Sequence, residues 1–104
     1  MRVCSQSDLG EGVIKRHRVS NHDILMVNLN GRLYALSNWC THEEGDLSRG
    51  EIEDECIVCE DHGAKFGLLS GEVVEGPLGE GRESIEKLRT FEVKIQEGDV
   101  FVSI

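Results

Sequence analysis

The segments C-T-H at residues 40–42 and C-E-D-H at residues 59–62 decide how this chain folds and what chemistry it can carry. Each segment offers one thiolate and one imidazole from a short stretch of backbone, and both groups are metal ligands. Ligand-type residues in this order rarely occur by chance. We therefore expect two loops to hold a metal centre between them, with Cys40, His42, Cys59 and His62 as its ligands.

In longer form the segments read C-T-H-E-E-G and C-E-D-H-G-A, and they resemble the C-x-H and C-x-x-H-G boxes of Rieske-type [2Fe–2S] proteins. Gly63 directly after the second histidine and Phe66 shortly beyond it agree with that family. Gly76-Pro77 resembles the proline-containing loop that shields the cluster there. The resemblance implies a small all-β fold, in which antiparallel sheets form a base and two loops form a cluster-binding subdomain.

The resemblance also implies one [2Fe–2S] cluster, bound by Cys40, His42, Cys59 and His62. In a Rieske cluster two cysteines hold one iron, two histidines hold the other, and sulfide bridges the irons. Neutral imidazoles donate less charge than thiolates, so the histidine-bound iron is the easier one to reduce. The imidazole nitrogen that does not bind iron can point outward and give electrons a short path to a partner. We expect residues behind the loops, such as Trp39 and Phe66, to exclude water from the cluster.

Departures from the respiratory branch of the family predict a low reduction potential. That branch has an extra cysteine in each box, joined as a disulfide, and the matching residues here are Gly45 and Asp61. It also has a serine and a tyrosine after the second histidine, whose hydroxyls hydrogen-bond to cluster sulfur, and the matching residues here are Ala64 and Phe66. Hydrogen bonds to sulfur stabilise the reduced cluster, so their absence lowers the potential. We expect the low end of the roughly −150 to +300 mV range of Rieske centres.

Composition predicts one small acidic domain, residues 1–104, with its cluster-binding part at about residues 38–77. The formal net charge of −9 argues against nucleic acid as a partner. It suits steering onto a basic face of another protein, although solubility alone explains it as well. No apolar run is long enough for a membrane span and no hydrophobic signal region is present, so we expect a cytoplasmic location without membrane contact. Four acidic residues flank the ligands and would mark the docking rim: Glu43, Glu44, Glu60 and Asp61.

Two cysteines remain outside the ligand boxes. A disulfide framework is expected only in a secreted chain, so metal ligation is the better interpretation for Cys40 and Cys59. The C-x-x-C spacing of Cys56 and Cys59 leaves a redox or zinc pair open, but Cys56 is more simply explained as a small apolar strand residue. Cys4 is expected to be packed and inert.

Turn signals between apolar runs predict strands along the whole chain. Asn30-Gly31 predicts a tight two-residue hairpin, because both positions favour positive φ. Residues 90–95 alternate as one strand, which turns at 97–99 and returns to 104. The polar, glycine-rich stretch 76–87 is longer than a tight connection requires, and a surface insertion with a helical turn at 83–87 explains it better than a partner-binding feature. The remaining strands are expected at 13–19, 24–29, 32–36, near 52, 55–58 and 65–68.

Together these features predict a soluble one-electron carrier rather than an enzyme. By resemblance to the small ferredoxin components of ring-hydroxylating dioxygenase systems, it would take electrons from a flavin-containing reductase and pass them to a terminal oxygenase. A small electron-transfer subunit of a nitrite-reductase-like enzyme is an alternative, although that branch often lacks the full ligand set. The four residues could also hold structural zinc, but such sites more often pair like ligands at C-x-x-C and H-x-x-x-H spacing.

Overall fold

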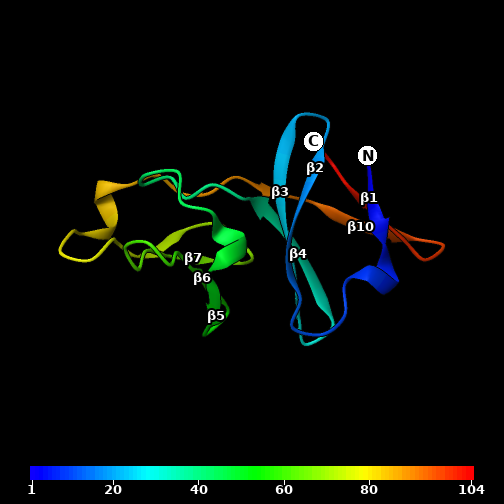
Figure 1. Cartoon of the computed structure of the whole chain (residues 1–104), viewed down its shortest axis with the longest axis horizontal. Helices are drawn as coiled ribbons and strands as arrows, with labels where there is room; N and C mark the ends of the chain where they lie inside the picture. Colours follow the sequence, from blue (N-terminus) through cyan, green and yellow to red (C-terminus); the bar gives the residue numbers. More distant parts are fainter.

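Three antiparallel sheets form the computed structural model, which describes residues 1–104. The molecule is elongated, 45 × 27 × 19 Å, with the ligand loops at one end and both chain termini in the other half (Figure 1). The expected all-β fold is confirmed, and no helix is long and apolar enough to cross a membrane. The strands are β1 (Arg2–Ser5), β2 (Ile14–Val19), β3 (His22–Leu29), β4 (Arg32–Ser37), β5 (Glu51–Glu53), β6 (Cys56–Val58), β7 (Lys65–Gly67), β8 (Val73–Glu75), β9 (Thr90–Phe91), β10 (Val93–Gln96) and β11 (Asp99–Val102). Three 3-10 turns are η1 (Gln6–Asp8), η2 (Leu47–Arg49) and η3 (Arg82–Ser84).

The middle sheet has the strand order β2-β3-β4-β9, and tight hairpins join its first three strands. Asn30 and Gly31, between β3 and β4, have φ angles of 55° and 86°. The predicted two-residue hairpin is therefore confirmed. Ser20 and Asn21, between β2 and β3, also have positive φ angles, 50° and 67°. The sequence does not predict this turn, because the turn contains no glycine.

Strand β3 is apolar on both faces because it lies between two cores. Alternate side chains of a strand point to opposite faces. Ile24 and Met26 face the core shared with the end sheet β1-β11-β10, whereas Leu25 and Val27 face the core that contains the ligand cysteines. All four side chains are fully buried. The middle sheet thus supports the ligand loops through direct packing.

The C-terminal region differs from the prediction of one strand over residues 90–95. β9 ends at Phe91 and pairs with β4, whereas β10 begins at Val93 and pairs with β11. The chain therefore passes from one sheet to another at Glu92, and an alternating pattern does not reveal such a change. The sequence pattern also does not predict β1, which pairs with β11 from the opposite end of the chain, or the short strand β8.

Candidate metal centre

The four predicted ligands lie on two loops that have the same backbone hydrogen-bond pattern. In each loop the cysteine N–H donates to the carbonyl five residues later at 2.8 Å, and the cysteine carbonyl accepts from the N–H four residues later at 3.0 Å. The fourth residue after the cysteine has a positive φ in both loops, 54° at Glu44 and 76° at Gly63. The C-x-H and C-x-x-H spacings therefore belong to one loop type, in which the histidine occupies neighbouring positions.

The two thiols lie in the interior and contact each other. Cys40 and Cys59 are each 2 % exposed. Burial raises the pKa of the Cys40 thiol to about 11; the backbone N–H of His42 opposes this rise, and the adjacent Cys59 thiol adds to it. A thiol in such a place becomes a thiolate when a metal cation replaces its proton. The pair is therefore suited to metal binding and poorly suited to ionisation on its own.

The two imidazoles meet edge to face, with ring centroids 4.7 Å apart and planes at 84°. His42 Nε2 lies 3.2 Å from Glu80 Oε2, and His62 Nε2 lies 3.6 Å from Glu43 Oε2. His42 Nδ1 is buried and has no hydrogen-bond partner. The ring therefore turns an unsatisfied nitrogen inward and its other nitrogen toward a carboxylate at the surface.

This donor set fits an iron–sulfur cluster with mixed ligands. The structure pairs the two predicted cysteines with each other and the two predicted histidines with each other, at the same end of the molecule. A buried ring nitrogen without a partner costs free energy unless it binds something. Two sulfur and two nitrogen donors are the set that a Rieske cluster requires. The other cysteines, Cys4 in β1 and Cys56 in β6, are buried strand residues, as predicted.

The connection 76–87 contacts both ligand loops. The Leu78 N–H donates to the His62 carbonyl at 2.7 Å, and the preceding residue, Pro77, is buried. The Thr41 hydroxyl donates to the Glu86 carbonyl. The expected helical turn is the single turn η3, slightly earlier than predicted. The connection is therefore part of the site and not a detached surface insertion.

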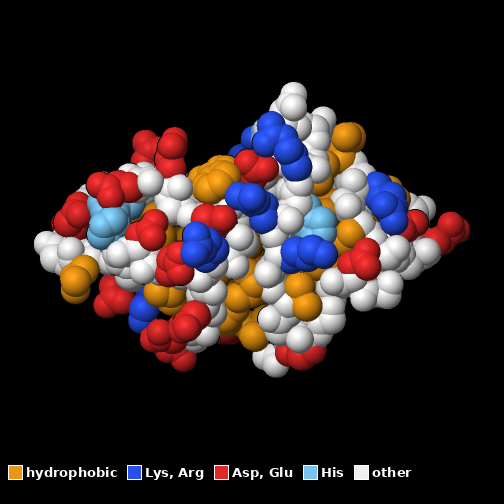
Figure 2. Space-filling view, in the orientation of Figure 1, with side chains coloured by type: hydrophobic (Ala, Val, Ile, Leu, Met, Phe, Trp, Pro, Cys, Tyr) orange, Lys and Arg blue, Asp and Glu red, His pale blue; other side chains and the backbone are white.

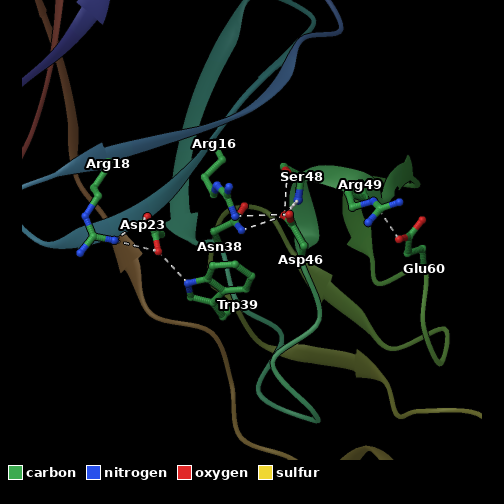
Figure 3. A network of polar contacts seen from close by, with 9 residues as sticks. All are labelled: Arg16, Arg18, Asp23, Asn38, Trp39, Asp46, Ser48, Arg49 and Glu60. Carbon is green, nitrogen blue, oxygen red and sulfur yellow. Dashed lines mark hydrogen bonds and ion pairs between the residues drawn. The ribbon is translucent and has the colours of Figure 1, made fainter.

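A polar network that the sequence analysis missed anchors the first loop to the middle sheet (Figure 3). Asp46 accepts hydrogen bonds from the Ser48 N–H at 3.0 Å, the Ser48 hydroxyl at 2.6 Å and the fully buried Asn38 amide at 2.9 Å. Its second oxygen pairs with Arg16 of β2 at 3.4 Å. Burial acts to raise the pKa of Asp46, but these hydrogen bonds outweigh burial and hold the pKa below its ordinary value. The D-x-S pattern at 46–48, typical of a helix cap, was the available signal.

Of the two aromatic residues expected to shield the cluster, Phe66 is fully buried in the core that contains the ligand cysteines. The prediction for Trp39 is wrong, because its side chain is 36 % exposed. The indole N–H donates to Asp23 at 3.0 Å, and Arg16 lies over the ring at 5.2 Å (Figure 3). A tryptophan N–H requires a partner, and this one finds it at the surface.

Gly45 and Asp61, which the resemblance matches to the extra cysteines of the respiratory branch, lie close together across the two loops. A Cβ atom on Gly45 would lie 2.6 Å from Asp61 Oδ2 and 2.8 Å from Cys59 Sγ. A side chain at position 45 therefore has no room. The Asp61 carboxylate thus lies near position 45, which itself adjoins the ligand Cys59.

Carboxylates surround the histidines at the loop end of the molecule (Figure 2). The Lys and Arg side chains visible on this face lie mostly over its middle and opposite parts. A negative surface of this kind attracts cationic surfaces and disfavours an added electron. The exposed acidic residues near the ligands are Glu43, Glu44, Glu60, Asp61 and Glu80.

Comparison with known proteins places these features in a family. The Rieske [2Fe-2S] domain family matches residues 1–92. The ferredoxin component of biphenyl 2,3-dioxygenase from Rhodococcus jostii is 33 % identical over 103 residues, covering 99 % of this chain and 91 % of the relative. Ferredoxin CarAc from Metapseudomonas resinovorans is 31 % identical over 104 residues, covering 99 % and 92 %.

Solved structures agree with these sequence relatives. A chain in the complex of reduced oxygenase and oxidised ferredoxin of carbazole 1,9a-dioxygenase matches with a TM-score of 0.84 at 31 % identity, covering 99 % of this chain and all of that one. The ferredoxin of Sphingomonas yanoikuyae B1 matches with a TM-score of 0.87 at 22 % identity, covering 100 % and 97 %, and shows the same fold.

Proposed function

The chain belongs to the Rieske [2Fe-2S] domain family, and we propose that it works as a ferredoxin, a one-electron carrier that relays electrons to an oxygenase. The observation that carries the proposal is the combination of two buried thiols with a buried imidazole nitrogen that has no partner. The relatives named above are ferredoxin components, which transfer electrons and do not transform substrate.

Each ligand residue has a separate role in this proposal. The thiolates of Cys40 and Cys59 would bind one iron, and His42 and His62 would bind the other through Nδ1. The cluster supplies a centre that accepts and releases one electron. Phe66 and the core around it exclude water from the cysteine side. Both Nε2 atoms lie beside surface carboxylates, and His62, which is 45 % exposed, is the ligand that a partner can approach.

The proposed reduction potential is low. Ala64 and Phe66 are fully buried and carry no hydroxyl that could donate a hydrogen bond to sulfur. The carboxylates around the histidines act in the same direction, because negative charge stabilises the oxidised cluster. Such a centre suits a relay that is fed by a reductase.

The proposed partners are a flavin-containing reductase as donor and an oxygenase as acceptor. The support is the similarity to ferredoxins of biphenyl and carbazole dioxygenases, together with an acidic rim that fits a basic docking face. Cys4 and Cys56, the two cysteines outside the ligand set, form no disulfide, which suits a reducing compartment, so the cytoplasm is the proposed location.

Metal analysis and spectroscopy of anaerobically purified protein test the ligand assignment. We expect two irons and two sulfides per chain, and a rhombic EPR signal of low average g in the reduced state. Cys59→Ser and His62→Ala should abolish that signal, whereas Cys56→Ser should leave it unchanged. A colourless protein that holds one zinc would overturn the assignment.

Reconstituted electron transfer tests the relay. The protein should pass electrons from a flavin-containing reductase to an oxygenase or a cytochrome, at a rate that falls with added salt, because an acidic rim docks through charge. A loaded protein that does not cycle between two redox states would contradict the proposed function.

A further inference from the structure

Each of the two histidines has a neighbouring carboxylate, but the two pairs differ in distance and in solvent exposure. The side chain of His42 is 16 % exposed and lies 3.2 Å from Glu80, which is 44 % exposed. The side chain of His62 is 45 % exposed and lies 3.6 Å from Glu43, which is 64 % exposed. His42 therefore has the closer and less solvated carboxylate.

The loop that carries Glu80 is folded to hold it in this place. The Leu78 N–H donates to the His62 carbonyl at 2.7 Å, and the Glu80 N–H donates to the carbonyl three residues earlier at 2.8 Å, which closes a turn. Gly76 and Gly81 meet at the base of this turn, so closely that a Cβ atom on Gly76 would collide with the Gly81 carbonyl. The loop is thus attached to the second ligand loop and reaches the first through the Glu80 side chain.

We propose that Glu80 sets the reduction potential of the cluster, lowering it through the carboxylate that it holds 3.2 Å from His42 Nε2. The inference rests on the proposed function, because it takes His42 as a ligand of the reducible iron. If Nδ1 binds iron, the ring proton is on Nε2, which is the atom beside the carboxylate. A carboxylate that accepts from a ligand imidazole makes that imidazole a stronger donor to the metal.

The charge of Glu80 and its effect on the imidazole shift the reduction potential in the same direction. The oxidised cluster is one unit more positive than the reduced one, so a fixed negative charge near the histidine-bound iron stabilises the oxidised state. A more strongly donating imidazole also favours the ferric ion. Water screens part of the Glu80 charge, because the side chain is partly exposed. We expect an effect of about tenfold on the reduction equilibrium, which is about 59 mV for one electron.

The test is an EPR-monitored redox titration of loaded protein at one fixed pH. Glu80→Gln keeps the shape of the side chain and an acceptor oxygen but removes the charge. Glu83→Gln is the matched control, since it removes one charge from the same connection and Glu83 forms no ion pair with either histidine. We expect the potential of Glu80→Gln to rise by the tenfold amount and that of Glu83→Gln to rise by less than a third of it. The nitrogen hyperfine couplings of the histidines should change in Glu80→Gln alone.

Equal shifts in the two variants would overturn the inference, because Glu80 would then act only as one of many surface charges. If Glu80→Gln does not retain its cluster, Glu80→Asp keeps the charge but withdraws the carboxylate by one methylene. A potential above wild type in Glu80→Asp supports the inference, and an unchanged potential contradicts it. Absence of the Rieske signal from wild type would refute the proposed function itself, which distinguishes the two failures.

Discussion

Substituting Asp46→Ala should release the first ligand loop from the middle sheet. One oxygen of Asp46 accepts three hydrogen bonds, from the N–H and hydroxyl of Ser48 and from the Asn38 amide, and the residue caps η2. Its removal leaves the fully buried Asn38 amide without an acceptor, which costs about 1–3 kcal/mol. Loss of the cap adds about 1 kcal/mol. The sum of roughly 2–4 kcal/mol is a large part of the 5–15 kcal/mol that stabilises a typical domain.

Urea unfolding of the loaded protein measures this effect, followed by the fluorescence of Trp39 and by the visible absorption of the cluster. Asp99→Ala is the matched control, because Asp99 pairs with Arg2 at 3.0 Å on the exposed surface and should cost less than about 1 kcal/mol. Asp46→Ala should unfold at lower urea with an unchanged slope, and its cluster colour should disappear at lower urea too. Equal losses of stability in both variants would refute the view that the Asp46 network anchors the loop.

Backbone strain, acid stability and sulfur hydrogen bonding give three further tests. Glu44→Gly should raise the free energy of unfolding by about 1 kcal/mol, because glycine adopts the φ of 54° without strain. Gly63→Ala should lower the free energy of unfolding by about as much, because alanine is strained at the φ of 76°. Thermal unfolding of both variants measures the two changes. Because the pKa of Asp46 is lowered in the folded state, its contribution to stability is complete above its unfolded pKa of about 3.9 and is lost as pH falls through the lower folded value. Asp46→Asn should therefore show a smaller loss of stability than wild type between about pH 5 and pH 2. Urea midpoints measured across this pH range check the prediction. Ala64→Ser places a hydroxyl near the cluster, and a hydrogen bond from it to sulfur that contributes about 1 kcal/mol should raise the reduction potential by about 40 mV. An unchanged potential in a redox titration would contradict the view that the missing hydroxyl keeps the potential low.

Features that depend on neighbouring residues could be predicted from the sequence. The Asn30-Gly31 hairpin and the two ligand boxes are of this kind, since turn residues and ligand types are local properties. The turn at Asp54 and Glu55 also has two positive φ angles, 49° and 61°, but this residue pair does not predict such a turn. There the pairing of β5 with β6 imposes the turn, and pairing is a property of the folded chain.

Contacts between distant segments explain most of what was missed at the site. Glu80 reaches His42 from another loop, and Arg16 reaches Asp46 from β2, so no sequence spacing reveals either pair. The orientation of Trp39 is different, because a signal existed. Residues 38 to 40 alternate as in a strand, with Asn38 and Cys40 buried and the residue between them exposed. A ligand cysteine that faces inward therefore requires Trp39 to face outward.

The core beneath the ligand loops consists of eleven buried residues, and two of them are Cys40 and Cys59. A copy that loses its cluster keeps two thiols in the middle of its packing with nothing bound between them, so its core loosens where its chemistry is lost. Local opening exposes backbone, so we expect an added protease to cleave cluster-free protein faster than loaded protein.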